Sequence, residues 1–544
     1  MRRTLAALLF AASPSAAIAL TAEDALTEHL SLLSLFGNFE VETTGTARGA
    51  DRLEVRGFKL TSENPDERTE ITLGGVDLVE QPDGAVRFVY PNRLPVEIRI
   101  QSGTDQPVLV SASFLFDGVR HIVSGTPGDL GHDLVAGSLS LEGVDVTGLE
   151  DDRVEETAFD LEDVAATFMR SNQGRGMHRM TLDVGHLYVA SLFDTASGSD
   201  ASGIATGDAD IAVTIGNLAA ASSYEGGDIP RHSLDLALGK ILWIQSSDTS
   251  DEDGRLDMEA RGTGVRLAWD VRVNHSDEDG AITPPLHNGE RISADFGYDS
   301  VEATGTIEMP EGAAAFASSD QGASVELSFS EDRALFSLEA RGNVTDYALA
   351  VPDVPVDRLS YALDAFEVAI EFPLLAKAEP QPYSMRFGLA GLTFNDEMWS
   401  LFDPIRKIPR DPISLALDIA GTTIVAIDFF DEDATARPYP EIVAKLKTLR
   451  VLGAGLDLTG SGEITSRIEG ATLSTEGRLD ARLVGLNGLL DSLADLELLS
   501  SEETMGLRMM LGVFTRPGAG SDTLVSTIEF APDGTVNANG QRIK

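Results

Sequence analysis

Alternation of apolar and polar residues dominates the chain from about residue 40 to residue 375. Val325, Leu327 and Phe329, for example, alternate with serine and glutamate. A period of two is typical of β-strands that bury one face. Residues 82–84 and 532–534 both read Pro-Asp-Gly between such runs, and this tripeptide favours tight turns. We therefore expect a mainly β protein with a large antiparallel sheet, either curved or in several layers.

The alternation changes phase within one of these segments. Leu359, Tyr361 and Leu363 occupy odd positions, whereas Phe366 and Val368 occupy even ones. A shift of one residue indicates either a β-bulge or a strand that changes the face it buries. The sequence leaves both alternatives open.

Helical spacing is expected near the start of the mature chain. Thr21 can cap a helix, with Asp24 three residues on, and Leu26, Leu30 and Leu33 then share one face. A few further helices are expected near the C-terminus, over residues 397–402 around Trp399, 487–498 and 501–514.

The last of these helices carries several large apolar side chains. We expect Leu507, Leu511 and Phe514 to line one stripe together with Met510. Met505, Met509 and Met510 are expected to fill gaps in a core, since methionine more often packs than binds.

The first nineteen residues have the layout of a secretory signal peptide. Arg2 and Arg3 precede an apolar run over residues 5–12, and Ala17 and Ala19 mark a small-residue cleavage site. No later segment reaches the roughly 18–20 unbroken apolar residues that span a bilayer. We therefore expect a periplasmic protein, cleaved after Ala19, with no stable transmembrane segment.

The mature chain is expected to have two main regions. A β-rich region covers residues 20–375, with two sub-domains if the small, polar segment 195–208 is a linker. A C-terminal region of strands and helices covers residues 376–544, and the segment 376–384 also interrupts the alternation.

Charge and cysteine content narrow the partners and the chemistry. The chain has 88 Asp and Glu against 41 Lys and Arg, a formal net charge of -47. Such a field repels phosphate backbones, so we expect no nucleic-acid partner. The absence of cysteine excludes disulfides, thiol nucleophiles and thiolate metal sites.

No motif identifies an active site. The histidines show no metal-binding spacing, and we interpret them as surface or packing residues. Two acidic turns, 251–254 and 277–280, resemble the middle of an EF-hand loop but lack its first and last ligands, although loose calcium binding stays open. We therefore assign no catalytic, cofactor-binding or metal-binding residue and expect no cofactor. The histidines are His29, His121, His132, His178, His186, His232, His275 and His287.

The C-terminal region carries a resemblance to a known family. The segments concerned are EPQPYSMRFGLAGLTFNDEMWSLFDP (379–404), RDPISLALDIAG (410–421), LVGLNGLLDSL (483–493) and residues 505–543. They resemble the uncharacterised alphaproteobacterial envelope family called domain of unknown function 2125, most specifically over residues 379–543. The resemblance implies export and a β-rich fold. It implies no reaction, cofactor or site residue.

These observations favour a non-enzymatic periplasmic protein that binds an apolar ligand such as a lipid, or an envelope partner. The reason is that one face of every alternating strand must be covered by something. Two alternatives stay open: a hydrolase, for example of polysaccharide, that uses two carboxylates, and a purely structural envelope protein. The oligomeric state is left open.

Overall fold

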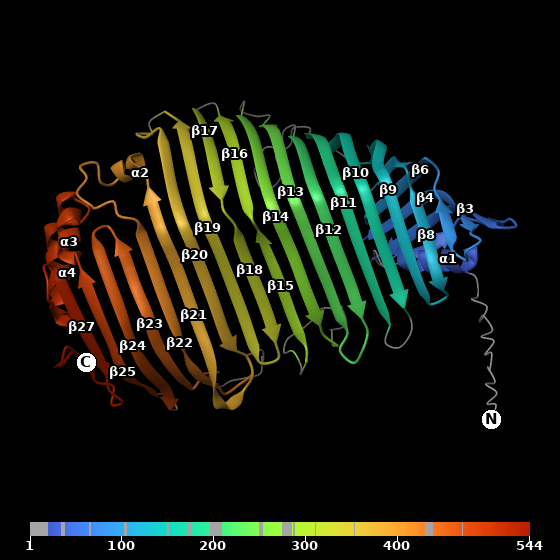
Figure 1. The fold of residues 1–544 in the computed structure, drawn as a ribbon. Coiled ribbons are helices and arrows are strands. Elements are labelled where there is room, and N and C mark those ends of the chain that lie inside the picture. Colours follow the sequence, from blue (N-terminus) through green and yellow to red (C-terminus); the bar gives the residue numbers. More distant parts are fainter. Residues whose placement is uncertain are drawn as a thin grey trace, which may run out of the picture. The chain divides into compact units, whose positions relative to one another are not determined.

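The computed structural model of the protein describes most of the chain and leaves short gaps. The described residues are 20–33, 39–64, 67–102, 106–148, 152–171, 176–195, 209–249, 254–274, 286, 289–309, 312–352, 354–429, 439–469 and 472–544. Their strands belong to one large antiparallel sheet, with one helix near the N-terminus and others near the C-terminus (Figure 1). The predicted fold class is confirmed. None of the helices in these segments is long and apolar enough to cross a membrane.

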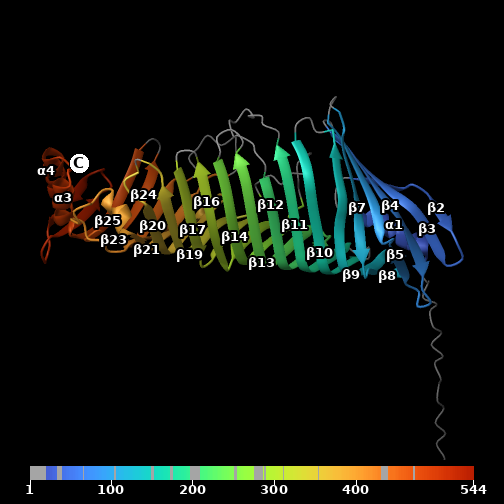
Figure 2. The same cartoon turned by 90° about the horizontal axis from the view of Figure 1, so that it is seen from above.

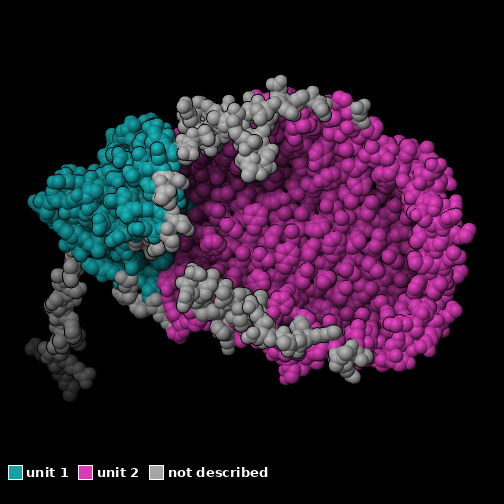
Figure 3. Space-filling view, turned by 180° about the vertical axis from the view of Figure 1, so that it is seen from behind, with its two compact units in different colours: residues 1–149, 160–182 teal, residues 150–159, 183–544 magenta. Residues whose placement is uncertain are grey.

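The chain divides into two compact units, which Figure 3 colours separately. Unit 1 comprises Met1–Leu149 and Asp160–Leu182, and unit 2 comprises Glu150–Phe159 and Asp183–Lys544. Of the two predicted interruptions, residues 196–208 lie outside the described residues. Residues 376–384 are not a linker, because strand β21 (Lys377–Phe394) begins there. It pairs with β22 (Ile413–Val425) from Lys377 and with β20 (Arg358–Pro373) from Ser384.

Unit 1 contains one helix and the first strands of the sheet, and strands β10 and β11 contribute to both units. Its elements are α1 (Ala22–Leu33), β1 (Glu40–Thr43), β2 (Thr46–Arg48), β3 (Arg52–Glu63), β4 (Glu67–Glu80), β5 (Val86–Val89), β6 (Arg93–Ser102), β7 (Val108–Asp117), β8 (Arg120–Thr126) and β9 (Asp129–Thr147). They are followed by β10 (Asp152–Ser171) and β11 (Met177–Thr195).

Helix α1 covers the apolar face of the unit 1 sheet. Its N-terminus is capped as predicted, since Asp24 N donates to Thr21 Oγ1 at 3.1 Å and Thr21 N donates to Asp24 Oδ2 at 3.2 Å. Ala25 and Leu26 are buried against the strands. Unit 1 is therefore a helix-on-sheet layer with a closed core. The strand residues of this core are Leu53, Val55, Phe58, Leu60, Val76, Leu78, Val86, Phe88, Val123 and Leu130.

Unit 2 consists mainly of long strands. They are β12 (Ala209–Glu225), β13 (Arg231–Thr249), β14 (Gly254–Arg272), β15 (Arg291–Tyr298), β16 (Ser300–Met309), β17 (Gly312–Asp320), β18 (Ala323–Ser330), β19 (Arg333–Ala350), β20, β21, β22 (Ile413–Val425), β23 (Glu441–Gly453), β24 (Leu456–Glu469) and β25 (Thr472–Val484). Short strands close the chain: β26 (Arg516–Pro517), β27 (Thr523–Phe530), β28 (Val536–Ala538) and β29 (Gln541–Arg542). The helices are α2 (Asp396–Ser400), α3 (Leu486–Asp495) and α4 (Ser501–Phe514).

The long strands of unit 2 form a single layer. Seen from above, α3 and α4 lie at the C-terminal end of this layer (Figure 2). The contiguous cluster of fully buried apolar residues lies wholly in unit 1. Unit 2 thus has long ladders of hydrogen bonds but leaves most of its apolar side chains only partly buried.

The phase shift in β20 is a bulge. Its neighbour β19 pairs with β20 through Arg341 and Asn343, while Gly342 and the facing Asp364 are left out of the ladder. Gly342 has a left-handed φ of 62°, which glycine adopts without steric cost. One residue of each strand is thus unpaired, so the alternation of both strands moves by one position while their register does not change. Other strands of unit 2 carry left-handed residues of the same kind at Asn217, Gly264 and Gly391.

The bulge keeps the apolar residues of β19 on one face. Leu374 N donates to Asp332 O at 3.0 Å, and Leu349 N donates to Asp357 O at 2.8 Å. Asp332 and Leu349 therefore both bond toward β20, although they lie on opposite sides of the bulge. Residues of one strand that bond to the same neighbour direct their side chains to the same face. Asp332 and every second residue after it, up to the bulge, therefore lie on the same face as Leu349 and every second residue before it, back to the bulge.

The C-terminal helices lie where they were predicted, but α4 packs differently. Trp399 in α2 is buried, as is Thr504 on the inner side of α4. The prediction that the methionines fill a core is wrong, because Met505, Met509 and Met510 are 64%, 66% and 53% exposed. The contact stripe passes through residues 504, 507 and 511, and the three methionines lie roughly 90–170° away from it round the helix, so they point outward. Phe514, also expected in the stripe, is exposed as well.

Replacing the bulge glycine tests this geometry. Gly342→Ala is expected to lower the free energy of unfolding by about 1–2 kcal/mol, because a Cβ is strained at positive φ. In both variants the Gln321 side chain, whose Cδ would lie 2.5 Å from the new Cβ, must shift. Gly342→Asn is nevertheless expected to cost less than Gly342→Ala, since asparagine tolerates the left-handed region. Urea unfolding followed by the fluorescence of the three tryptophans, Trp243, Trp269 and Trp399, measures the free energy of unfolding of both variants.

Gly506→Ala is the matched control for this pair. It lies inside α4 with open space around it, so alanine there is expected to be neutral or stabilising by up to about 1 kcal/mol. If alanine and asparagine at position 342 lower the free energy of unfolding equally, a left-handed bulge is contradicted.

Candidate functional site

One face of the unit 2 sheet carries uncharged side chains in long rows. Directly paired residues of an antiparallel sheet point to the same face, so the ladder register defines rows across the strands. Two such rows each cross twelve strands from β13 to β27, and we call the face that carries them the apolar face. The first row is Leu236, Leu267, Phe296, Val325, Leu338, Val368, Phe387, Leu417, Leu449, Gly460, Ala481 and Ser526. The second row is Leu234, Trp269, Ala294, Leu327, Phe336, Ile370, Met385, Ile419, Leu446, Gly462, Leu479 and Ile528.

The opposite face of the same strands is charged. Ion pairs cross the ladders there, for example between Arg386 and Glu367 at 3.0 Å and between Arg272 and Asp270 at 3.1 Å. Such exposed pairs contribute little stability each, but they keep this face in water. The row that lies between the two apolar rows points to this charged face and contains Asp235, Ala268, Asp295, Glu326, Ser337, Ala369, Arg386 and Asp418.

The apolar face is the hollowed side of unit 2 (Figure 3). In Figure 1, β19 runs upward with β20 on its left. In a strand of L-residues that runs upward, a residue whose backbone N–H and C=O point to the left neighbour has its side chain directed away from the viewer. Leu349 bonds in this way, so it and the residues on its face point toward the viewer of Figure 3.

Large apolar side chains on this face stay open to solvent. Trp269 is 47% exposed, Phe296 45% and Met385 41%. Single exposed apolar residues are common in proteins, but contiguous ones mark binding surfaces. The apolar face therefore has the character of a binding site.

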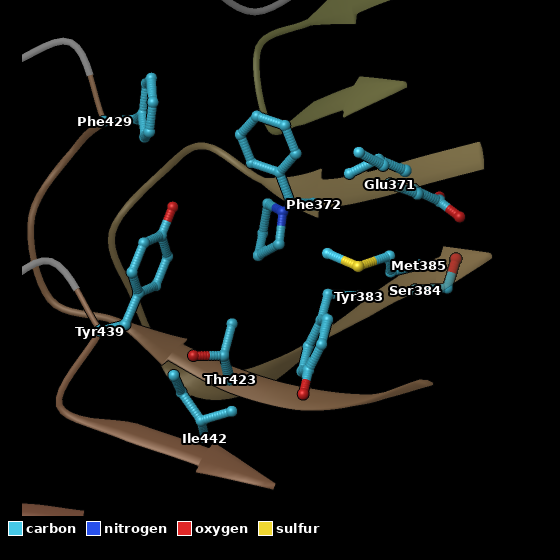
Figure 4. A pocket seen from close by; sticks show the side chains of 11 residues that line it. Glu371, Phe372, Tyr383, Ser384, Met385, Thr423, Phe429, Tyr439 and Ile442 are labelled. Carbon is cyan, nitrogen blue, oxygen red and sulfur yellow. The ribbon is translucent and has the colours of Figure 1, made fainter. Parts of the chain in front are cut away.

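A cavity of about 370 Å³ opens on the apolar face near strands β20 to β23. Figure 4 shows Phe372 and Tyr383 on the strands, with Phe429 and Tyr439 facing them from the segments that flank the gap after β22. The rings of Phe372 and Phe429 lie 5.6 Å apart. The cavity is lined by Ile370, Glu371, Phe372, Pro373, Tyr383, Ser384, Met385, Thr423, Phe429, Tyr439 and Ile442.

Backbone hydrogen bonds hold the outer wall of the cavity in place. Phe429 N donates to Leu374 O at 2.9 Å, and Ala376 N donates to Asp428 Oδ1 at 2.7 Å. The buried hydroxyl of Thr423 donates to Glu441 O at 2.8 Å. The wall is thus tied to the ends of strands β20 to β23.

The cavity is chemically suited to hydrocarbon. Burial raises the pKa of Tyr383 and that of Tyr439, so both hydroxyls are neutral. The one carboxylate of the lining, Glu371, points away from the cavity in Figure 4 and accepts a hydrogen bond from Arg333. The lining offers apolar surface and the hydroxyls of Tyr383, Tyr439, Ser384 and Thr423, with no charged group aimed inward.

A second cluster of chemical groups lies in the core of unit 1. It joins His29 of α1, His121 of β8, His132 of β9 and Tyr90, which follows β5. Tyr90 Oη and His121 Nδ1 lie 2.8 Å apart, and His121 Nε2 and His132 Nδ1 lie 3.1 Å apart. His29 packs on Phe88 with ring centroids 4.9 Å apart. His29 Nδ1 and His132 Nε2 are buried without a hydrogen-bond partner.

Burial keeps these histidines neutral. It lowers the pKa of His29 and of His121 to about 3 and that of His132 to about 4, and neighbouring histidines lower the first two further. Burial also raises the pKa of Tyr90. The cluster is therefore a set of uncharged packing groups at neutral pH.

No metal centre is found where the chain is described: it contains no group of three or more His, Asp or Glu placed to hold an ion. The acidic residues of the turns at 251–253 and 277–280 lie outside the described residues. Arg508, on α4, pairs with Asp491 of α3 at 2.6 Å.

The two sites differ in how far the sequence could reveal them. The alternation along each strand could have revealed the apolar face, but which residues lie side by side depends on the register. The histidine cluster had no signal, because its members are far apart in the chain and come from three elements.

Comparison of the chain with known protein families, curated proteins and solved structures finds no match. The resemblance of residues 379–543 to the alphaproteobacterial envelope family stays a prediction.

Acid is expected to destabilise unit 1 before unit 2. An unfolded histidine titrates near pH 6.5, whereas the three clustered histidines bind protons only near pH 3–4 when folded. Their contribution is therefore complete above pH 6.5 and is lost as the pH falls toward 4. At pH 4.5 the loss amounts to about 2–3 kcal/mol per histidine. Hydrogen exchange of peptides from both units, followed from pH 7.5 to 4.5, measures the loss of stability of each unit.

His29→Leu is the informative variant, since its unpartnered nitrogen loses no hydrogen bond. It should leave unit 1 stable at pH 7.5 and reduce the proton uptake on opening from about three to about two. His232→Leu in unit 2 serves as the control and should leave the unit 1 response unchanged. If unit 1 loses the same stability between pH 7.5 and 4.5 with and without His29, this account is contradicted.

Proposed function

We propose that unit 2 binds the hydrocarbon part of a lipid or a similar apolar ligand on its apolar face. The cavity at β20 to β23 is one of the binding positions. One observation carries the proposal: two uncharged rows cross twelve strands on the hollowed side, while the intervening row places charges on the other side. A ligand that covers this face removes apolar surface from water without desolvating a charged group.

The energetics favour a long apolar ligand. Each large side chain that is covered contributes roughly 1.5–3 kcal/mol, and Phe372, Met385 and Phe429 lie close together around the cavity. Export to the periplasm, as the signal peptide predicts, would place the protein between two membranes that contain such ligands.

The hydrolase alternative is less well supported. It needs two carboxylates in one cleft, but the described carboxylates of the regular ladders point to the charged face, and many are paired with arginine, as Glu367 and Asp270 are. One exception is Asp320, which accepts a hydrogen bond from Tyr298 on the apolar side. Asp332, in the turn before β19, shares this face but is paired with Lys377 at 3.3 Å, which leaves Asp320 without a second candidate carboxylate for this chemistry. A purely structural role would leave the apolar face without a ligand.

A charge placed on the apolar face tests the proposal. Met385→Glu is expected to weaken binding of a fluorescent fatty acid about tenfold or more, because the bound chain would desolvate the carboxylate. Ala369→Glu is the matched control. It lies on the charged face directly opposite Arg386, so binding should not change.

Mass spectrometry of lipid that co-purifies with the wild-type protein supplies an independent result. Equal fatty-acid binding by Met385→Glu and Ala369→Glu would contradict the proposed face. Wild-type protein that purifies free of lipid and binds no fatty acid would contradict the function and favour a structural role.

A further inference from the structure

We infer that the apolar face acts as a track that holds more than one acyl chain at a time, laid across the strands. This inference rests on the proposed function and extends it from one seat to the full width of the face. The ligand class is the long acyl chain of a membrane lipid or of a free fatty acid.

The first argument is length. Neighbouring strands lie about 4.8 Å apart, so a row that crosses twelve strands extends over about 50 Å of sheet. The hydrocarbon core of a bilayer is about 30 Å thick and holds two leaflets, so one acyl chain spans about 15 Å. The face is therefore about three chain lengths wide.

The second argument is the distribution of exposed apolar groups. Trp269 on β14 and Met385 on β21 belong to the same row and are similarly exposed. Five strand steps, or roughly 24 Å, separate them. A single chain seated in the cavity beside Met385 cannot reach Trp269, and it would leave that half of the face open to water.

The third argument is direction. The two rows are separated by two residues, or about 7 Å, along every strand except β23, where Leu446 and Leu449 are three residues apart at a register shift. The two rows therefore run across the strands side by side. No charged residue interrupts either row between β13 and β27, so an apolar chain laid along them meets no charged group in either row.

Photocrosslinking at both ends of the row tests the track. A photoreactive phenylalanine derivative replaces Trp269 or Met385, and the full-length protein is incubated with labelled palmitate or with phosphatidylethanolamine vesicles. We expect crosslinks to the label at both positions. The controls carry the same group at Ala268 or Arg386, which point to the charged face, and should give none. The two probes distinguish a free fatty acid from a membrane lipid as the source of the chain.

Native mass spectrometry of the unmodified protein with palmitate gives the number of bound chains without any substitution. We expect two or more, and we expect Met385→Glu to retain the crosslink at position 269. One bound chain with crosslinking at 385 alone would overturn the track and leave the proposed function standing. The absence of bound palmitate and of any crosslink at either position would overturn both.

Discussion

The structure depends on one constraint: a strand with alternating side chains has an apolar face that must be covered. In unit 1 this is met within the chain, because α1 packs on the strands and closes a core around Phe58 and Phe88. In unit 2 the described helices belong to the C-terminal end, and the long strands form a single layer. The same alternation therefore produces a closed core in one unit and an open apolar face in the other.

This difference also changes what stabilises each unit. Unit 1 relies on burial of apolar surface. Unit 2 relies more on continuous ladders of backbone hydrogen bonds, with cross-strand side-chain contacts such as the perpendicular rings of Phe366 and Phe387, 5.5 Å apart. A covering ligand would add to unit 2 the apolar burial that unit 1 already has.

The sequence predicted the elements better than their surroundings. Period two, the Pro-Asp-Gly turns and the Thr21–Asp24 cap are local signals, and the strands and helices formed where these occur. The phase shift near residue 364 could not be interpreted locally, because a bulge is recognised from the pairing with Gly342 on the next strand. The histidine cluster and the exposure of Met509 depend on contacts between distant segments, which composition and spacing do not encode.

The arrangement of the two faces has an evolutionary consequence. Neighbouring positions on each strand have different requirements, since one contributes to the apolar side and the next faces water among ion pairs. A charged residue at Ala268 or Ser337 would interrupt neither apolar row, whereas one at Trp269 or Phe336 would. The positions that must stay apolar change between odd and even at each bulge. We therefore expect substitution rates along the chain to have a period of two, with a phase shift at each bulge.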